Sequence, residues 1–344
     1  MTNSEEPMQI SEFKDKKTGL IAFGVIQIIF GGFCALSIPL MILGMLVSTI
    51  SGKSPAAPMS GRVMVPSVLF YVVLAVWFIW MGVGSIKARR WARALILVSS
   101  SLWLICGIGG LIVFMLLFPG MYDQMAKNPQ MPPAAVSIMK FTMIGFMTVF
   151  YVVIPAVFVL FYKSKNVKAT CEFRDTQVRW TDKCPLPVLA VSFLFGIWAA
   201  SALFTGFYKW TIPFFGFILS GIPGAAVALV IMLLSAYVAW GTYRLNMKAW
   251  WCSLLLIIAL ALSTVITFSR VNLWDVYSDL YEKMNFSRQQ IDMMRQYGVP
   301  QTSTLAVLFG LWSLGLSTYL LYIRRYFLHP PDQESSSQQT QTYV

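Results

Sequence analysis

Eight long apolar stretches limit what this chain can fold into. They contain no Asp, Glu, Lys or Arg apart from Arg93 near the start of the third. Each is about as long as the roughly 20 residues that an α-helix needs to cross the hydrocarbon core of a bilayer. Because backbone polar groups in hydrocarbon must be bonded internally, we expect each stretch to be a transmembrane helix. The stretches cover residues 19–47, 66–86, 92–118, 141–162, 187–208, 223–243, 249–269 and 304–323.

The composition agrees with a membrane protein and argues against a soluble one. Hydrophobic residues make up 57% of the chain and charged residues 12%, whereas soluble domains average about 45–50% and about 25%. The net charge of +12 would suggest nucleic acid in a soluble protein. Here the cations lie at the ends of the apolar stretches, where they contact lipid headgroups. The sequence therefore predicts an all-α polytopic membrane protein whose partners are membrane lipids and not nucleic acid.

The distribution of cations predicts the orientation in the membrane. Of the 26 Lys and Arg residues, 17 lie on one side of the predicted membrane, in the connecting segments or at Arg93 just beyond one of them. Lys and Arg are enriched in cytoplasmic segments. We therefore predict a plasma (inner) membrane protein with both termini in the cytoplasm. The cation-rich segments are 1–18, 87–91, 163–186, 244–248 and 324–344.

Six of these cations lie in two short turns or, for Arg93, just beyond one of them, and are predicted to anchor the helix ends to lipid headgroups. They are Lys87, Arg89, Arg90, Arg93, Arg244 and Lys248.

The two turns are also similar to each other, which suggests an internal duplication. Gly84-Ser85 ends the second stretch and Gly241-Thr242 ends the sixth, and each stretch begins at a proline 18 residues earlier. Because four helices return the chain to its starting side, such halves are parallel repeats. We expect a cytoplasmic tail (1–18), a first four-helix repeat (19–162), a cytoplasmic basic linker (163–186), a second repeat (187–327) with an outer loop (270–303), and a disordered cytoplasmic tail (328–344).

Residue types in the stretches argue against catalysis and metal binding. Intramembrane hydrolysis needs paired carboxylates or a bound metal at depth, and these stretches supply neither. His329 is the only histidine and the five cysteines are scattered, whereas zinc needs about four N or S ligands. We therefore predict no enzyme activity, no metal and no cofactor. Asp275, Asp279 and Glu282 lie at helical spacing in the outer loop and are expected to form a solvated face.

Two functions remain open from the sequence. The absence of ionisable groups favours a non-enzymatic structural or partner-binding component, with a protein partner or a homo-oligomer in the membrane. The alternative is a carrier or binding protein for an apolar or zwitterionic small molecule at the interface of the repeats. Proline removes a backbone donor and interrupts a helix, and Ser37 with Pro39 matches Thr211 with Pro213. These four residues are the candidate ligand positions, unless the prolines only turn the chain at the outer boundary.

Three local signals lie in the outer loop and at the C-terminus. Ser287 and Gln290 form a capping box, which predicts a short helix over 288–297. Asn285 begins an N-x-S sequon. The final Thr342-Tyr343-Val344 resembles a carboxyl terminus that a sheet edge captures.

Overall fold

The computed structural model describes residues 14–51, 61–117, 122, 132–283, 288, 291–292 and 302–328. Within them, eight helices are long and apolar enough to cross a membrane. The fourth has three parts, α5 and α6 being joined by a π-helical turn over Val149–Val153. The eight are α1 (Lys17–Ser51), α2 (Gly61–Ile86), α3 (Arg90–Leu117), α5 with α6 (Pro133–Thr148 and Ile154–Lys163), α8 (Leu186–Phe204), α9 (Ile222–Tyr243), α10 (Met247–Arg270) and α13 (Thr302–Ile323). The prediction of eight helices is confirmed.

The helix boundaries agree closely with the sequence expectation, with one clear exception. The fourth helix begins at Pro133 and not at residue 141, because Pro132 and Pro133 start it and the exposed Lys140 lies inside it. Proline suits the first turn of a helix, where its missing N–H has no partner to lose. The predicted helix over 288–297 lies largely outside the described residues, and Asn285 and residues 342–344 lie wholly outside them.

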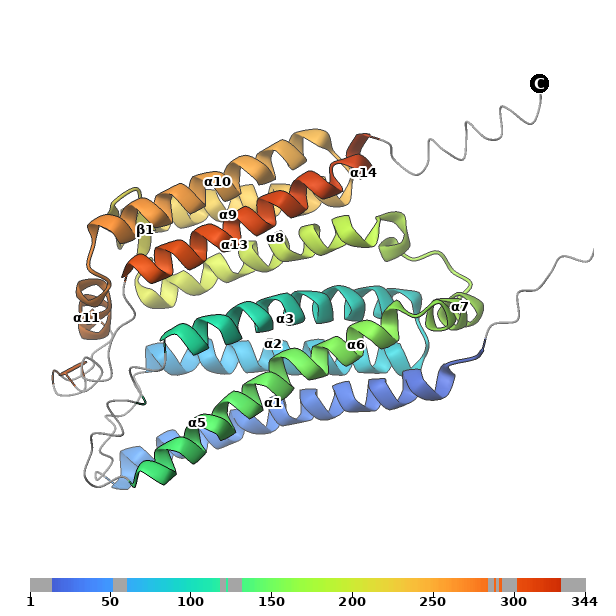
Figure 1. Ribbon diagram of the computed structural model, residues 1–344, viewed down its shortest axis with the longest axis horizontal. Helices are drawn as coiled ribbons and strands as arrows, with labels where there is room; N and C mark the ends of the chain where they lie inside the picture. Colours follow the sequence, from blue (N-terminus) through green and yellow to red (C-terminus); the bar gives the residue numbers. More distant parts are fainter. Residues whose placement is uncertain are drawn as a thin grey trace, which may run out of the picture.

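The helices form two groups of four that lie side by side (Figure 1). The first group holds α1, α2, α3 and α5/α6, and the second holds α8, α9, α10 and α13. Each group has its own buried cluster: Tyr162 and Ile96 belong to the first, Phe195 and Trp250 to the second. The groups meet where α3 packs on α8. At this contact Ala94 and Val98 of α3 belong to the second cluster.

Glycines allow α1 and α2 to pack closely as an antiparallel hairpin. A β-carbon on Gly24 of α1 would lie 2.8 Å from the backbone oxygen of Gly82 on α2. One on Gly82 would lie 2.7 Å from the backbone oxygen of Gly24. Membrane helices have no hydrophobic driving force to associate, because lipid tails are as apolar as their side chains. Small residues let the two backbones approach closely enough for van der Waals packing to hold them together.

The turns between α2 and α3 and between α9 and α10 have the same backbone. Ala88 and Leu245 are both left-handed, with φ of 49° and 55°. In the first turn Ala88 N–H bonds to Ser85 O and Arg89 N–H to Gly84 O; in the second, Leu245 N–H bonds to Thr242 O and Asn246 N–H to Gly241 O. This is the Schellman pattern of a helix C-terminus. The end of the bundle that holds these turns is called the basic end below.

The predicted linker is folded, which its polar sequence did not indicate. It contains α7 (Lys165–Arg174) and a 3₁₀ helix (Trp180–Lys183). Val167, Thr170 and Cys171 are buried, so tertiary packing holds α7 in place. A further short helix, α14 (Arg325–Leu328), follows α13 at the same end (Figure 1).

The opposite end, called the loop end below, carries a β-hairpin and a helix. The strands are β1 (Ile212–Phe214) and β2 (Phe217–Leu219), paired antiparallel with Pro213 opposite Ile218. The helix is α11 (Leu273–Lys283), which includes the three outer carboxylates. The stretches predicted as helices leave residues 209–222 unassigned, so the hairpin was not foreseen.

Candidate functional site

The hairpin is fixed on the loop end of α10 by two hydroxyl groups. Phe215 N–H donates to Ser263 Oγ at 3.0 Å, and Gly216 N–H donates to Thr267 Oγ1 at 2.9 Å. Ser263 and Thr267 are four residues apart and so lie on one face of α10. The turn residues Phe215 and Gly216 have φ of 41° and 95°. Their N–H groups point out of a tight two-residue turn, and α10 supplies the acceptors that hydrocarbon lacks.

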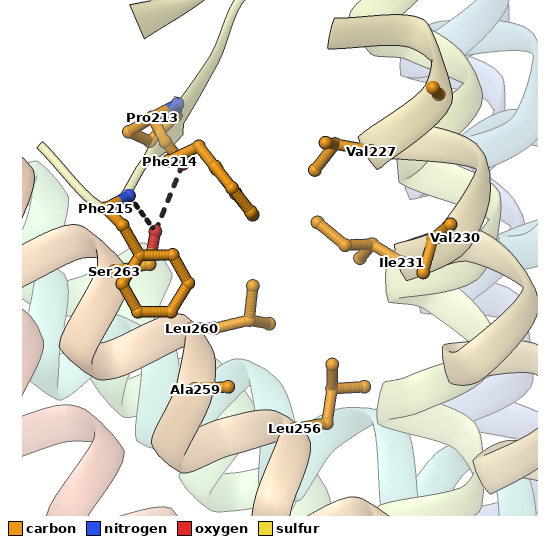
Figure 2. Close-up of a pocket in the computed structure, with 11 residues that line it drawn as sticks. Pro213, Phe214, Phe215, Val227, Val230, Ile231, Leu256, Ala259, Leu260 and Ser263 are labelled. Carbon is orange, nitrogen blue, oxygen red and sulfur yellow. Dashed lines mark hydrogen bonds between the residues drawn. The ribbon is translucent and has the colours of Figure 1, made fainter. Parts of the chain in front are cut away.

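An apolar groove of about 360 Å³ lies between this hairpin, α9 and α10 (Figure 2). The hairpin covers one end, and Ile231 and Leu256 lie deep in the groove near the middle of their helices. Residues from all three elements line it: Pro213, Phe214 and Phe215; Ala226, Val227, Val230 and Ile231; Leu256, Ala259, Leu260 and Ser263.

The groove is open toward the outside of the helix bundle. Val230 is 55% exposed, and Phe214, Phe215 and Ala259 are also exposed. Its only side-chain oxygen, Ser263 Oγ, already accepts from Phe215 and lies 3.4 Å from Pro213 O. No Asp, Glu, Lys, Arg, His or Cys is among its lining residues. The lining therefore offers a ligand apolar contacts and a single hydroxyl group.

The four candidate ligand residues are divided between the two helix groups. Pro213 lines the groove. Thr211 Oγ1 donates to Tyr208 O at 2.8 Å, before the strand begins. Ser37 Oγ donates to Phe33 O at 2.8 Å in α1, which continues through the exposed Pro39. Pro39 thus lies in the first group and Pro213 in the second.

A buried carboxylate organises the basic end. Asp175 is 2% exposed and follows α7. It accepts from Arg179 Nε at 3.1 Å and Nη2 at 2.9 Å, and from Arg89 Nη1 at 3.4 Å. It also accepts from the N–H of Arg90, the first residue of α3, at 3.2 Å. A linker residue therefore caps the first turn of a transmembrane helix.

The arginines lower the pKa of Asp175. Burial raises it, but the hydrogen bonds from Arg179 and the Arg90 N–H, with the charges of Arg179 and Arg89, lower it more. The net pKa lies below its ordinary value, so the carboxylate is ionised at neutral pH. The ionised carboxylate stabilises the fold because it pairs with Arg89 and Arg179 at the junction of α3 and the linker.

The cations expected to be lipid anchors have several environments. Arg89 and Arg90 pair with Asp175 and Asp182, respectively, and Arg93 Nε donates to Tyr162 O at 3.1 Å. The guanidinium of Arg244 lies 4.7 Å from the Trp240 ring centre. Lys87 and Lys248 are exposed. Sequence reasoning missed Asp175, although Arg179 four residues later was a detectable signal.

The linker contacts both helix groups at the basic end. Lys16 N–H, just before α1, donates to Thr170 Oγ1 of α7 at 3.0 Å. Tyr243 OH, at the end of α9, donates to Trp180 O at 2.9 Å. Asp15 and Arg174 add an ion pair at 2.6 Å. The segment is thus a structural junction between the groups.

No known relative guides the interpretation of these two sites. Searches against models of protein families, curated proteins and solved structures find no match to this chain.

Proposed function

We propose that this chain is a non-enzymatic multi-pass membrane protein that binds one hydrocarbon chain in the groove between α9, α10 and the hairpin. The single observation that supports it is the groove itself: about 360 Å³ of apolar space beside exposed helix faces. That volume lies at the lower end of the range of small-molecule sites. An empty space of this kind forfeits van der Waals contacts, and in a bilayer the nearest filler is a chain. This location differs from the repeat interface expected from the sequence.

Photo-crosslinking tests the proposal. The full chain, purified in detergent, is incubated with a long-chain fatty alcohol that carries a diazirine in mid-chain, and the labelled peptides are mapped. We expect labels on residues 226–231 and 256–260. Val227→Trp fills the groove and should remove most of this labelling. Leu229→Trp is the matched control, because Leu229 is 51% exposed and is not among the groove residues.

Even labelling of all lipid-facing helices, or equal labelling in the two tryptophan variants, would contradict chain binding. The structural or partner-binding role expected from the sequence stays a prediction. The same purification tests it, because such a role predicts a second protein that co-purifies in a fixed ratio.

We also propose that the two helix groups are parallel repeats. Two features support it besides the matching turns. A β-carbon on Gly84 would lie 2.6 Å from that of Ala92, and one on Gly241 would lie 2.4 Å from that of Ala249. At the following position, Arg93 donates to a carbonyl of α6 and Trp250 donates to Leu320 O of α13. Superposition of the groups that requires one to be inverted would contradict the repeat.

The proposed orientation places the basic end in the cytoplasm of a plasma-membrane protein. The excess of cations at that end supports it. In a variant without the native cysteines, a cysteine in place of Val178 should resist an impermeant reagent added to intact cells, and one in place of Asn272 should react. Both positions are exposed in the structure, and the reverse labelling pattern would contradict the orientation.

A further inference from the structure

We infer that the groove selects a fatty acid, whose carboxylate binds Arg270; this inference rests on the proposed function. Lipid tails are as apolar as the groove lining, so a hydrocarbon chain gains no hydrophobic energy by moving from the bilayer into the groove. Packing alone therefore gives little preference among amphiphiles. Selectivity has to come from a polar group near the end of the groove.

Arg270 is placed to supply that group. It is the last residue of α10, about one turn beyond Thr267 and two turns beyond Ser263, whose hydroxyls hold the hairpin. Its side chain lies across the hairpin turn, since a β-carbon on Gly216 would be 3.0 Å from Arg270 Cδ and 3.4 Å from Nη1. The preceding turn residue, Phe215, lines the groove. The Arg270 side chain thus lies against the hairpin turn, at the residue that follows Phe215.

The charge of Arg270 is available to a ligand. The side chain is exposed, and no described carboxylate pairs with it. A cation at a helix C-terminus is also favoured by the helix dipole, which explains the residue type but not its position over the turn. Lys209 adds a second exposed cation at the base of the hairpin, where its carbonyl accepts from Gly221 N–H at 2.8 Å. Both cations lie at the loop end.

The shape of the groove points to one chain with an anionic head. The seven-residue step from Ser263 to Leu256 along α10 corresponds to about 10 Å of groove length. The volume suits a single chain and not the two chains of a phospholipid. Guanidinium binds a carboxylate through two parallel hydrogen bonds, which gives geometric selectivity as well as affinity. A fatty acid meets all three requirements.

The test compares three photoreactive probes with the same diazirine-bearing chain: a fatty acid, a fatty alcohol and an alkylammonium. With the purified full chain at neutral pH, we expect the fatty acid to label the groove at roughly tenfold or more lower concentration than the alcohol, as a charged hydrogen bond implies. The alkylammonium should label least. Arg270→Gln should abolish the preference while leaving labelling by the alcohol intact, and Arg270→Lys should retain part of it.

The controls separate this inference from the proposed function. Arg244→Gln, at the opposite end, should leave the preference unchanged, and melting curves should show that the Arg270 variants are folded. Groove labelling that is equal for all three probes, or a preference that survives Arg270→Gln, overturns the head-group inference alone. Absence of groove labelling by every probe overturns the proposed function as well. Stronger competition by a two-chain phosphatidic acid overturns the assignment to a fatty acid.

Discussion

The two turns at the basic end share a backbone but differ in what stabilises them. In the second turn, Asn246 Oδ1 accepts from Lys248 N–H at 2.9 Å and so caps α10 from within the turn. In the first turn, Asp175 performs this task for α3 from a position 85 residues away. The second turn is therefore a local structure. The first depends on the linker, so the linker, α3 and the first helix group are expected to lose structure together.

Removing the distant cap should have the largest effect on stability. Asp175→Asn keeps the shape but removes the charge that two arginines share, and we expect a loss on the order of 3 kcal/mol in the free energy of unfolding. Denaturant titration in detergent micelles measures it. Glu172→Gln is the control, because Glu172 pairs with Lys168 at 3.7 Å on the exposed face of α7, where pairs contribute about 0–1 kcal/mol. Equal losses in the two variants would contradict a special role for Asp175.

When the glycine of each turn is replaced by alanine, a second substitution should restore stability to different extents in the two turns. Gly241→Ala places a β-carbon 2.4 Å from that of Ala249, and Gly84→Ala places one 2.6 Å from Ala92 and 2.7 Å from the Trp91 ring. We expect each to cost about 1–3 kcal/mol. Ala249→Gly should restore most of the stability at Gly241, whereas Ala92→Gly should restore less at Gly84, because Trp91 remains. Full rescue at both turns would contradict this difference.

Acid should weaken the first turn and leave the second unchanged. The pKa of Asp175 is lowered in the fold, while an unfolded Asp has a pKa of about 3.9. The stabilisation is therefore complete above about pH 3.9 and is lost as the pH falls through the folded value. We expect the melting temperature to fall more steeply below about pH 4 in the native chain than in Asp175→Asn. Parallel curves would contradict the assignment.

The helices could be predicted well from the sequence because each is determined by the apolar pattern of its own residues. About 20 apolar residues between polar turns leave few alternatives to a spanning helix. The start of the fourth helix was missed because the charged Lys140 interrupts the apolar pattern inside that helix. The hairpin was missed because its tight turn places Phe215 at a left-handed position, where Asn, Asp or Gly is the usual signal. Ser263 and Thr267 stabilise that turn from another helix.

The two sites were less accessible from sequence because they depend on tertiary arrangement. The groove exists only through the relative positions of α9, α10 and the hairpin, and of the predicted ligand residues only Pro213 lines it. Asp175 was not identified because it lies in a segment predicted to be a basic linker. Its partners Arg89 and Arg90 are also far away in sequence. Its position four residues before Arg179 was the one local signal.

The smallest expected effect is at the local cap of the second turn, and it tests most directly whether that turn is stabilised without the linker. Asn246→Ala removes the acceptor for Lys248 N–H, and losses of such caps are typically about 1 kcal/mol. Because Asn246 is exposed, water replaces the lost acceptor and no charge is left unpaired, so the loss should stay below that of Asp175→Asn. Asn246→Asp should be neutral or slightly stabilising, since it keeps the cap and places a negative charge at a helix N-terminus. If Asn246→Ala instead destabilises the chain as much as Asp175→Asn, the second turn is not self-contained, and the proposed difference between the two halves is wrong.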